Sequence, residues 1–151
     1  MNIGRICNRE VVVAQAGDPL SRAARAMCEQ HVGMVVVTEE QAGKRVPVGV
    51  VTDRDIVRTQ LGHAADLFCL GVAQAMTAKP LVLPESEGLV EAIEHLRARG
   101  VRRAPVVDAG GALIGVVSVD DLLAVVAEQL SGLSRLSAGQ RAHEPRLAPY
   151  T

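Results

Sequence analysis

Hydrophobic and polar positions follow one another along this chain in a pattern that occurs twice. One set of apolar residues is Leu20, Ala23, Ala24 and Met27. These positions are spaced as i, i+3, i+4 and i+7, which places their side chains on one face of a helix. The same spacing returns 69 residues later, at Leu89, Ala92, Ile93 and Leu96. The pattern therefore predicts two equivalent amphipathic helices and indicates an internal repeat.

The strands around these helices repeat as well. The run VVV at 35–37 corresponds to APV at 104–106, and GVVTDRDIV at 49–57 corresponds to GVVSVDDLL at 115–123. Each copy is predicted to form a strand, a helix, a strand, a turn, a strand and a helix. The predicted elements span 11–13, 20–30, 34–38, 46–51 and 53–61 in the first copy, and 81–83, 87–99, 104–108, 113–117 and 119–129 in the second.

The repeat divides the chain into two halves with an α/β (α+β) fold. We assign residues 1–63 to the first repeat, 64–75 to a connector, 76–130 to the second repeat and 131–151 to a C-terminal tail. One copy is too small to cover both faces of its own sheet, so the two copies are expected to pack together through their sheets. The tail is rich in Ser, Gly, Pro and Arg, and we expect it to be mobile or to pack on a partner.

Aromatic residues are almost absent from the chain. It has one Tyr, one Phe and no Trp, while 48% of its 151 residues are hydrophobic. The core must therefore consist of aliphatic side chains, and modules that stack nucleobases on aromatic rings are excluded. The net charge of -1 offers no basic excess for a phosphate backbone. Arg97 and Arg99 are interpreted as a solvated helix face, and no nucleic acid partner is expected.

The cysteines and the hydropathy pattern favour a cytoplasmic protein. Cys7, Cys28 and Cys69 are widely spaced and form no C-x-x-C pair, which is typical of a reducing compartment. The start of the chain lacks the apolar stretch of a signal peptide, and no apolar run reaches the roughly 18 residues that cross a bilayer. Cys28 and His31 have the i, i+3 spacing of two metal ligands, but a small apolar role is more common for such a cysteine, so no metal is expected.

Two Gly-Val-Val-Thr/Ser-x-x-Asp segments carry the candidate chemistry, each where a predicted strand ends and a helix begins. Their polar pairs are Thr52 with Asp55 and Ser118 with Asp121. In one interpretation, the hydroxyl and the carboxylate cap the helix. In the other, free N–H groups and the hydroxyl bind a phosphate, while the carboxylate accepts the hydroxyls of a ribose. The occurrence of the motif at equivalent places favours a ligand cleft.

These segments resemble the cystathionine β-synthase (CBS) domain, which occurs in tandem pairs called Bateman modules. The resemblance covers residues 5–130 and also rests on GVRRAPVVDAGG at 100–111 and AMTAKPLVLPESEGLVEAI at 75–93. It implies two pseudo-symmetric repeats of β-α-β-β-α type. In that family, similar motifs bind adenosine-containing ligands in a cleft between the paired repeats.

The resemblance implies two ligand sites, one built on each motif. Their polar residues are Thr52 and Asp55 for one site and Ser118 and Asp121 for the other. Arg102 and Arg103 directly precede a strand, and their guanidinium groups suit phosphate oxygens. We assign both arginines to the Ser118/Asp121 site, which is then expected to take the more charged nucleotide; the Thr52/Asp55 site would take a less phosphorylated ligand or stay empty. The aliphatic residues proposed for an adenine slot are Val12, Val32, Leu81 and Val101.

The resemblance further implies a regulatory protein that is not an enzyme. We expect a stand-alone module that binds an adenosine nucleotide, AMP or ATP before ADP, S-adenosylmethionine or NAD, and signals by a change of conformation or oligomeric state. A structural module with vestigial clefts is one alternative. A nucleotide-processing enzyme is another, although the sequence shows no nucleophile with an adjacent base.

CBS modules commonly pair, so the resemblance also implies a homodimer, together with a regulated partner protein that the sequence does not identify. No membrane partner is expected. The apolar candidates for the dimer interface lie on the helices that close the two repeats: Ile56, Val57, Leu122, Leu123, Val125 and Val126.

Overall fold

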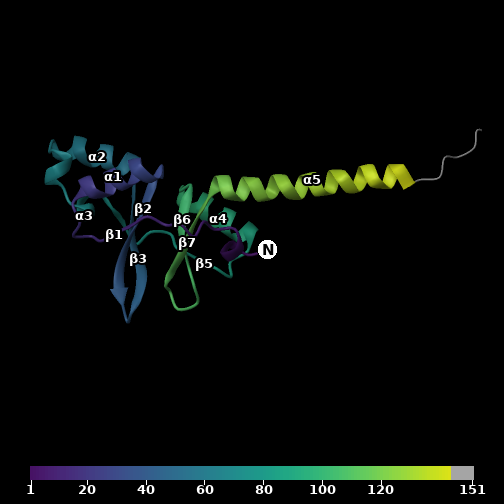
Figure 1. Ribbon diagram of the computed structural model, residues 1–151, viewed down its shortest axis with the longest axis horizontal. Coiled ribbons are helices and arrows are strands. Elements are labelled where there is room, and N and C mark those ends of the chain that lie inside the picture. The colour runs from purple at the N-terminus through teal and green to yellow at the C-terminus, as the bar shows by residue number, and fades with distance from the viewer. Residues whose placement is uncertain (144–151) are drawn as a thin grey trace, which may run out of the picture.

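Two small β-sheets lie side by side, and helices pack against each of them (Figure 1). The computed structural model describes residues 1–143. The first half contains β1 (Val13–Ala14), α1 (Leu20–Gln30), β2 (Met34–Gln41), β3 (Lys44–Thr52) and α2 (Asp53–His63). The second half contains β5 (Leu83–Pro84), α4 (Leu89–Arg99), β6 (Arg103–Val107), β7 (Leu113–Ser118) and α5 (Val119–His143). The remaining short elements are η1 (Ile3–Arg5), η2 (Leu67–Cys69), α3 (Val72–Ala75) and β4 (Thr77–Ala78).

Each half has the predicted order of strands and helices. The strand order is β1-β2-β3-β4 in one sheet and β5-β6-β7 in the other. In both sheets the first pair is parallel and the second is antiparallel. Contacts between β3 and β7 join the two sheets. The α/β fold of two pseudo-symmetric repeats packed through their sheets is confirmed.

Each half has its own aliphatic core, as the scarcity of aromatic residues requires. The helix faces predicted from the sequence pack inward: Leu20 is fully buried under the first sheet, and Ala92 is fully buried under the second. His31 caps the C-terminal end of α1 and Gly100 caps that of α4, and both of these residues adopt the left-handed conformation (φ 53° and 64°). Gly100 takes this conformation without strain, as expected of a helix terminator.

The two halves exchange short segments at the start of each repeat. Ile3 belongs to the core of the second half, and its N–H donates to the Glu87 carbonyl at 2.8 Å. Asn8 pairs with Val116 of β7 in the second sheet. In return, β4 pairs with β3 of the first sheet. The start of each predicted repeat, 1–63 and 76–130, thus contributes to the sheet of the opposite half.

All three cysteines are free thiols, with Cys28 and Cys69 exposed and Cys7 buried. Burial raises the pKa of the Cys7 thiol, since a thiolate would lose its hydration there. Cys7 thus packs as a small apolar side chain in the second core. In the described part of the chain, no three His, Cys, Asp or Glu side chains converge as a metal site.

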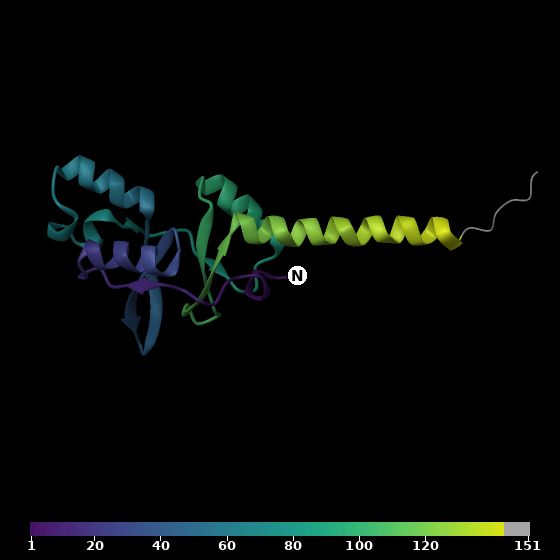
Figure 2. The ribbon, with the colours of Figure 1, turned by 45° about the horizontal axis from the view of Figure 1, so that its top comes forward.

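Helix α5 is longer than the sequence pattern predicts. The pattern predicts an end at Gln129, yet α5 runs without interruption from Val119 to His143 and projects away from the body (Figures 1 and 2). Residues 131–143 of the expected tail are therefore helical, and residues 144–151 lie outside the described part of the chain. No helix among the described residues is both long and apolar enough to cross a membrane.

The candidate dimer residues on the closing helices differ in exposure, and two of them, Val125 and Val126, are half-buried. Ile56 and Leu122 are 7% and 3% exposed because they pack into the cores of their own halves, so they are not available for a dimer. Val57 and Leu123 are 56% and 59% exposed. The helices that close the repeats therefore do present apolar side chains, but fewer than the sequence suggested.

Candidate ligand-binding clefts

Thr52 and Asp55 form the N-terminal cap of α2. Thr52 ends β3, and its extended backbone (φ -100°, ψ 162°) leads the chain into the helix. The Asp55 N–H donates to Thr52 Oγ1 at 3.1 Å, and the Thr52 N–H donates to Asp55 Oδ2 at 2.9 Å. This capping box satisfies N–H groups that a helix start leaves free. It leaves the Thr52 hydroxyl proton and Asp55 Oδ1 for a ligand.

Ser118 and Asp121 form the equivalent cap of α5. The Ser118 N–H donates to Asp121 Oδ2 at 2.8 Å, and the Asp121 N–H donates to Ser118 Oγ at 3.2 Å. Here the hydroxyl also donates to Asp121 Oδ2 at 2.7 Å, so its proton is already engaged. The capping interpretation is confirmed for both motifs, and it is compatible with ligand binding because a cap uses only part of each side chain.

The Thr52/Asp55 motif lines a cleft of about 510 Å³ between the two halves. The opposite wall belongs to the second half and consists of the residues just before β5 and just before β6. It includes two of the four predicted aliphatic residues, Leu81 and Val101, and both predicted arginines, Arg102 and Arg103. Val101 is 38% exposed, so its apolar side chain is open to the cleft. The volume falls in the range of roughly 300–1,000 Å³ that is usual for small-molecule sites.

Positive charge is concentrated in this larger cleft. Its charged lining residues are Arg54, Arg58, Arg99, Arg102 and Arg103, with Asp53 and Asp55. Arg102 Nη2 lies 3.5 Å from Asp120 Oδ1, but the two side chains are 70% and 73% exposed, so this ion pair contributes little stability. Because five guanidinium groups outnumber two carboxylates, the cleft suits a ligand with several negative charges.

Three of these arginines are not among the site residues predicted from the sequence. Arg54 and Arg58 lie one helical turn apart on α2, directly after Thr52, and this spacing from the motif is the signal that could have identified them. The sequence pattern places Arg99 on a solvated helix face, yet Arg99 lines the cleft and donates from Nη2 to the Lys79 carbonyl at 3.3 Å. A helix pattern alone does not show which exposed residues of the last turn border a cleft.

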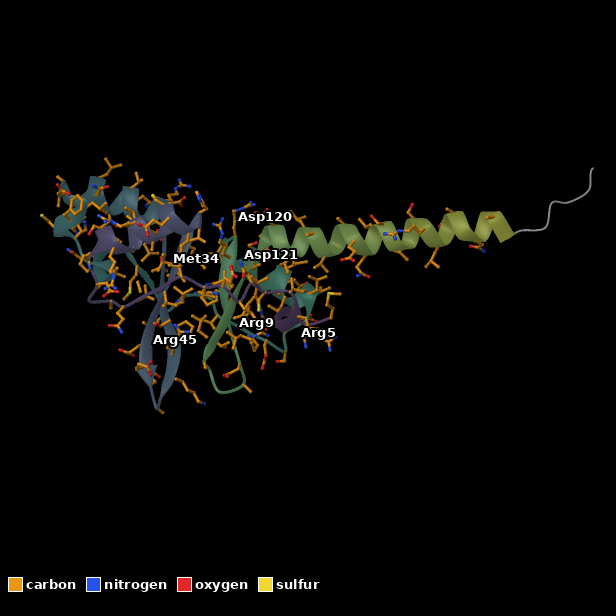
Figure 3. The ribbon with its side chains drawn as sticks, viewed as in Figure 1. Arg5, Arg9, Met34, Arg45, Asp120 and Asp121 are labelled. Atoms are coloured by element: carbon orange, nitrogen blue, oxygen red, sulfur yellow. The ribbon has the colours of Figure 1, made fainter. Side chains whose placement is uncertain are left out.

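The Ser118/Asp121 motif lines a smaller cleft of about 210 Å³. Val12 and Val32 contribute aliphatic surface from the first half, as predicted. Figure 3 shows Met34 and Asp121 on the two sides of the junction between the halves, and both line this cleft. Its arginine is Arg103, accompanied by the acidic Glu10 and by Asp121 itself.

The structure brings Arg103, but not Arg102, together with Ser118 and Asp121 in one cleft. Each cleft combines the capping motif of one half with the residues that lead into β2 or β6 of the other half. This follows because the two sheets face each other. Arg102 therefore lies in the Thr52/Asp55 cleft, and Arg103 lines both clefts. A Cβ atom on Gly33 would lie only 3.4 Å from Arg103 Nη1, so the glycine leaves room for this guanidinium group. The more positively charged cleft is thus the one for which the sequence predicts a less phosphorylated ligand or none.

A comparison with protein families finds two matches along the chain. The model of the CBS domain matches residues 3–62 and again residues 72–128. These ranges coincide with the two repeats and cover most of the chain, including both capping motifs.

Curated relatives share the same region. A 17.7 kDa protein of Acidianus ambivalens is 30% identical over 120 residues, which cover 80% of this chain and 70% of the relative. An uncharacterised protein of Methanopyrus kandleri is 29% identical over 126 residues, and this chain spans only 62% of its length. Inosine-5'-monophosphate dehydrogenase of Thermoplasma acidophilum is 26% identical over 143 residues, which make up 27% of that enzyme.

Solved structures show the same fold. A CBS domain protein of Pyrobaculum aerophilum complexed with AMP has a TM-score of 0.74 and 25% identity, with 87% of this chain and 99% of that chain covered. A putative signal-transduction protein with CBS domains from Burkholderia ambifaria has a TM-score of 0.74 and 26% identity, with 85% and 96% covered. CBSX2 in complex with AMP has a TM-score of 0.71 and 25% identity, with 84% and 96% covered. With both of its halves matched by the family model, the chain belongs to the CBS domain family and carries two CBS domains in tandem.

Proposed function

We propose that this protein is a regulatory nucleotide sensor whose principal ligand is an adenine nucleotide bound in the Thr52/Asp55 cleft. The phosphates would lie among the arginines and at the Thr52 hydroxyl, and Asp55 Oδ1 would accept the ribose hydroxyls. Leu81 and Val101 would supply apolar surface for the adenine base. The two neighbouring structures that contain AMP support an adenine ligand for a fold of this type.

The observation that carries this proposal is the convergence of charge and motif in one cleft. Thr52, Asp55 and five arginines line the same 510 Å³ space. Charge-assisted hydrogen bonds from guanidinium groups to phosphate are among the stronger polar interactions in proteins. Affinity should therefore rise with the number of phosphates, which favours ATP over AMP and AMP over adenosine.

The smaller cleft is a weaker candidate for a charged nucleotide. Its 210 Å³ lies below the usual range for small-molecule sites, and the Ser118 hydroxyl already donates to Asp121. Glu10 would also repel a phosphate there. We infer that this cleft binds adenine nucleotides less tightly than the larger one.

A signal could pass from the larger cleft to α5 through Arg102. A phosphate would compete with Asp120, on the first turn of α5, for the Arg102 guanidinium. The ligand would also bridge α2 of the first half and the entry to β6 of the second. Such a ligand shifts the arrangement of the halves only by its difference in affinity for the two states, typically about 1–3 kcal/mol of coupling.

We propose that the protein acts in the cytoplasm as a homodimer and regulates a partner protein. Another solved relative, a CBS-CP12 protein from bloom-forming cyanobacteria, is hexameric. Val57 and Leu123 offer exposed apolar surface for association. If no adenosine compound binds, the structural role of the module replaces the nucleotide sensor as the proposed function. Turnover of a bound nucleotide would instead indicate an enzyme.

Replacing Arg102 by glutamine should weaken ATP binding about tenfold, because a hydrogen bond to a charged group contributes about 1.5–3 kcal/mol. The same change should affect adenosine much less, since adenosine has no phosphate. Isothermal titration calorimetry with adenosine, AMP and ATP measures both effects.

Arg97→Gln provides the matched control, because Arg97 lies on α4 but does not line the larger cleft. It should leave all three affinities unchanged. Equal affinity of the wild-type protein for adenosine and ATP would contradict a role of the arginines in phosphate binding.

A further inference from the structure

The C-terminal part of α5 projects from the body of the molecule. Every side chain described from Ala127 to Gln140 is exposed, and Figure 2 shows this segment extending away from both halves. It carries three exposed leucines: Leu130, Leu133 and Leu136, which are 61%, 62% and 70% exposed. Their spacing of three residues places them along one side of the helix.

The composition of this segment is unfavourable for an isolated helix. Residues 130–140 include Gly132, Gly139 and three serines, which are weak helix formers. Helices of this length are marginal in water even when their sequences favour helix formation. The segment therefore needs a packing partner for its leucines in order to remain helical.

The leucine side of the segment is continuous with an apolar groove on the body. The groove has a volume of about 220 Å³ and runs between α4 and the first part of α5. Its apolar lining includes Ile93, Leu96, Leu123 and Val126. Val126 precedes Leu130 by one helical turn, so the groove and the leucines form a single apolar strip along α5.

We propose that this strip binds the same strip of a second copy, with the two α5 helices antiparallel. This inference rests on the homodimer of the proposed function and names its interface. With a two-fold axis near Leu130, Leu136 of each copy lies opposite Leu123 of the other, and Leu133 lies opposite Val126. The projecting segment of each chain then covers the apolar groove of its partner.

The charges of α5 favour an antiparallel arrangement. The helix begins with Asp120 and Asp121, Glu128 follows in its middle, and Arg135 lies in its projecting part. Antiparallel helices bring Arg135 toward the acidic half of the partner helix, and their macrodipoles also oppose each other favourably. Parallel helices in register would pair Glu128 with Glu128 and Arg135 with Arg135, which is repulsive.

The test compares the solution mass of three proteins by light scattering at equal micromolar concentration. The wild-type chain should be a dimer, and Leu133→Glu should be a monomer that keeps its affinity for ATP. Ala138→Glu, on the opposite side of the same exposed segment, should remain a dimer. Two results would overturn the proposal. One is a monomeric wild-type chain, which would assign the strip to another protein. The other is an unchanged mass for Leu133→Glu.

Spin labels test the antiparallel orientation. A label on Ala138→Cys, with Cys28 and Cys69 replaced by serine, should lie about 24 Å from its copy along the helix axis, since each residue adds about 1.5 Å. In a parallel pair in register the two labels would lie level with each other, without this axial separation, and the correspondingly shorter label distance would overturn this arrangement. If the wild-type protein binds no nucleotide, the mass and the label distance remain measurable, so the two proposals fail separately.

Discussion

Asp55→Asn should weaken ATP binding at least about tenfold. The carboxylate is proposed to accept both hydroxyls of the ribose, and an amide has only one acceptor oxygen. A hydrogen bond to a charged acceptor contributes about 1.5–3 kcal/mol, which corresponds to roughly a ten- to hundredfold change in the dissociation constant. Calorimetric titration of the purified variant measures this change.

Asparagine is chosen because it preserves the cap. Asp55 Oδ2 accepts the Thr52 N–H at 2.9 Å, and an asparagine oxygen accepts the same hydrogen bond. The free energy of unfolding should therefore change by less than about 1 kcal/mol. A loss of binding in this variant then reports on the ligand contact and not on unfolding.

Asp121→Asn is the matched control, since it alters the equivalent cap in the smaller cleft. It should leave the strongest ATP site almost unchanged. If Asp121→Asn abolishes ATP binding while Asp55→Asn does not, the nucleotide occupies the smaller cleft, and the assignment of the principal site is wrong.

Gly115→Ala should lower the free energy of unfolding by about 1–3 kcal/mol, the usual cost of an added methyl group in a packed core. A Cβ atom on Gly115 would lie 2.7 Å from Cys7 Sγ and 2.8 Å from the Asn8 carbonyl oxygen. Asn8 cannot move away easily, because its N–H and carbonyl both pair with Val116 at 2.9 Å. The new methyl group must therefore displace the N-terminal segment from the second sheet.

Two other glycines serve as controls in urea denaturation. Gly49 holds the equivalent place in the first half, but the atom nearest to an added Cβ there is at the flexible end of Met76, at 2.8 Å, so Gly49→Ala should cost less. Gly62 lies in α2 with open space around it, and Gly62→Ala should stabilise the helix slightly. Equal stability of Gly115→Ala and the wild-type protein would show that residues 1–8 do not complete the second sheet.

Sequence periodicity was sufficient to predict the repeated core. The i, i+3, i+4 pattern from Leu20 and from Leu89 corresponds closely to α1 and α4, because burial of one helix face dominates the placement of these elements. The two motifs were correctly located at strand-to-helix junctions, since the hydroxyl and the acid are strong capping signals. Local sequence signals were therefore sufficient to predict the fold of each half separately.

Relations between the halves were not predictable in the same way. The exchange of Ile3 into the second core and the placement of Arg102 opposite Thr52 depend on how the two sheets face each other, and no local pattern encodes this. The length of α5 was also missed, because Gly132 and its serine neighbours are typical of a helix end. Its leucines become informative only once the structure shows them exposed along one projecting helix.

Titration of the wild-type protein with ATP tests the central claim most directly. We expect saturable binding with a dissociation constant below about 100 µM, because several guanidinium contacts and an apolar surface together supply more than about 5.5 kcal/mol. The affinity should fall as salt is added, since the contacts are charged and partly exposed. Absence of any heat of binding at millimolar ATP would contradict the assignment of the Thr52/Asp55 cleft as a nucleotide site.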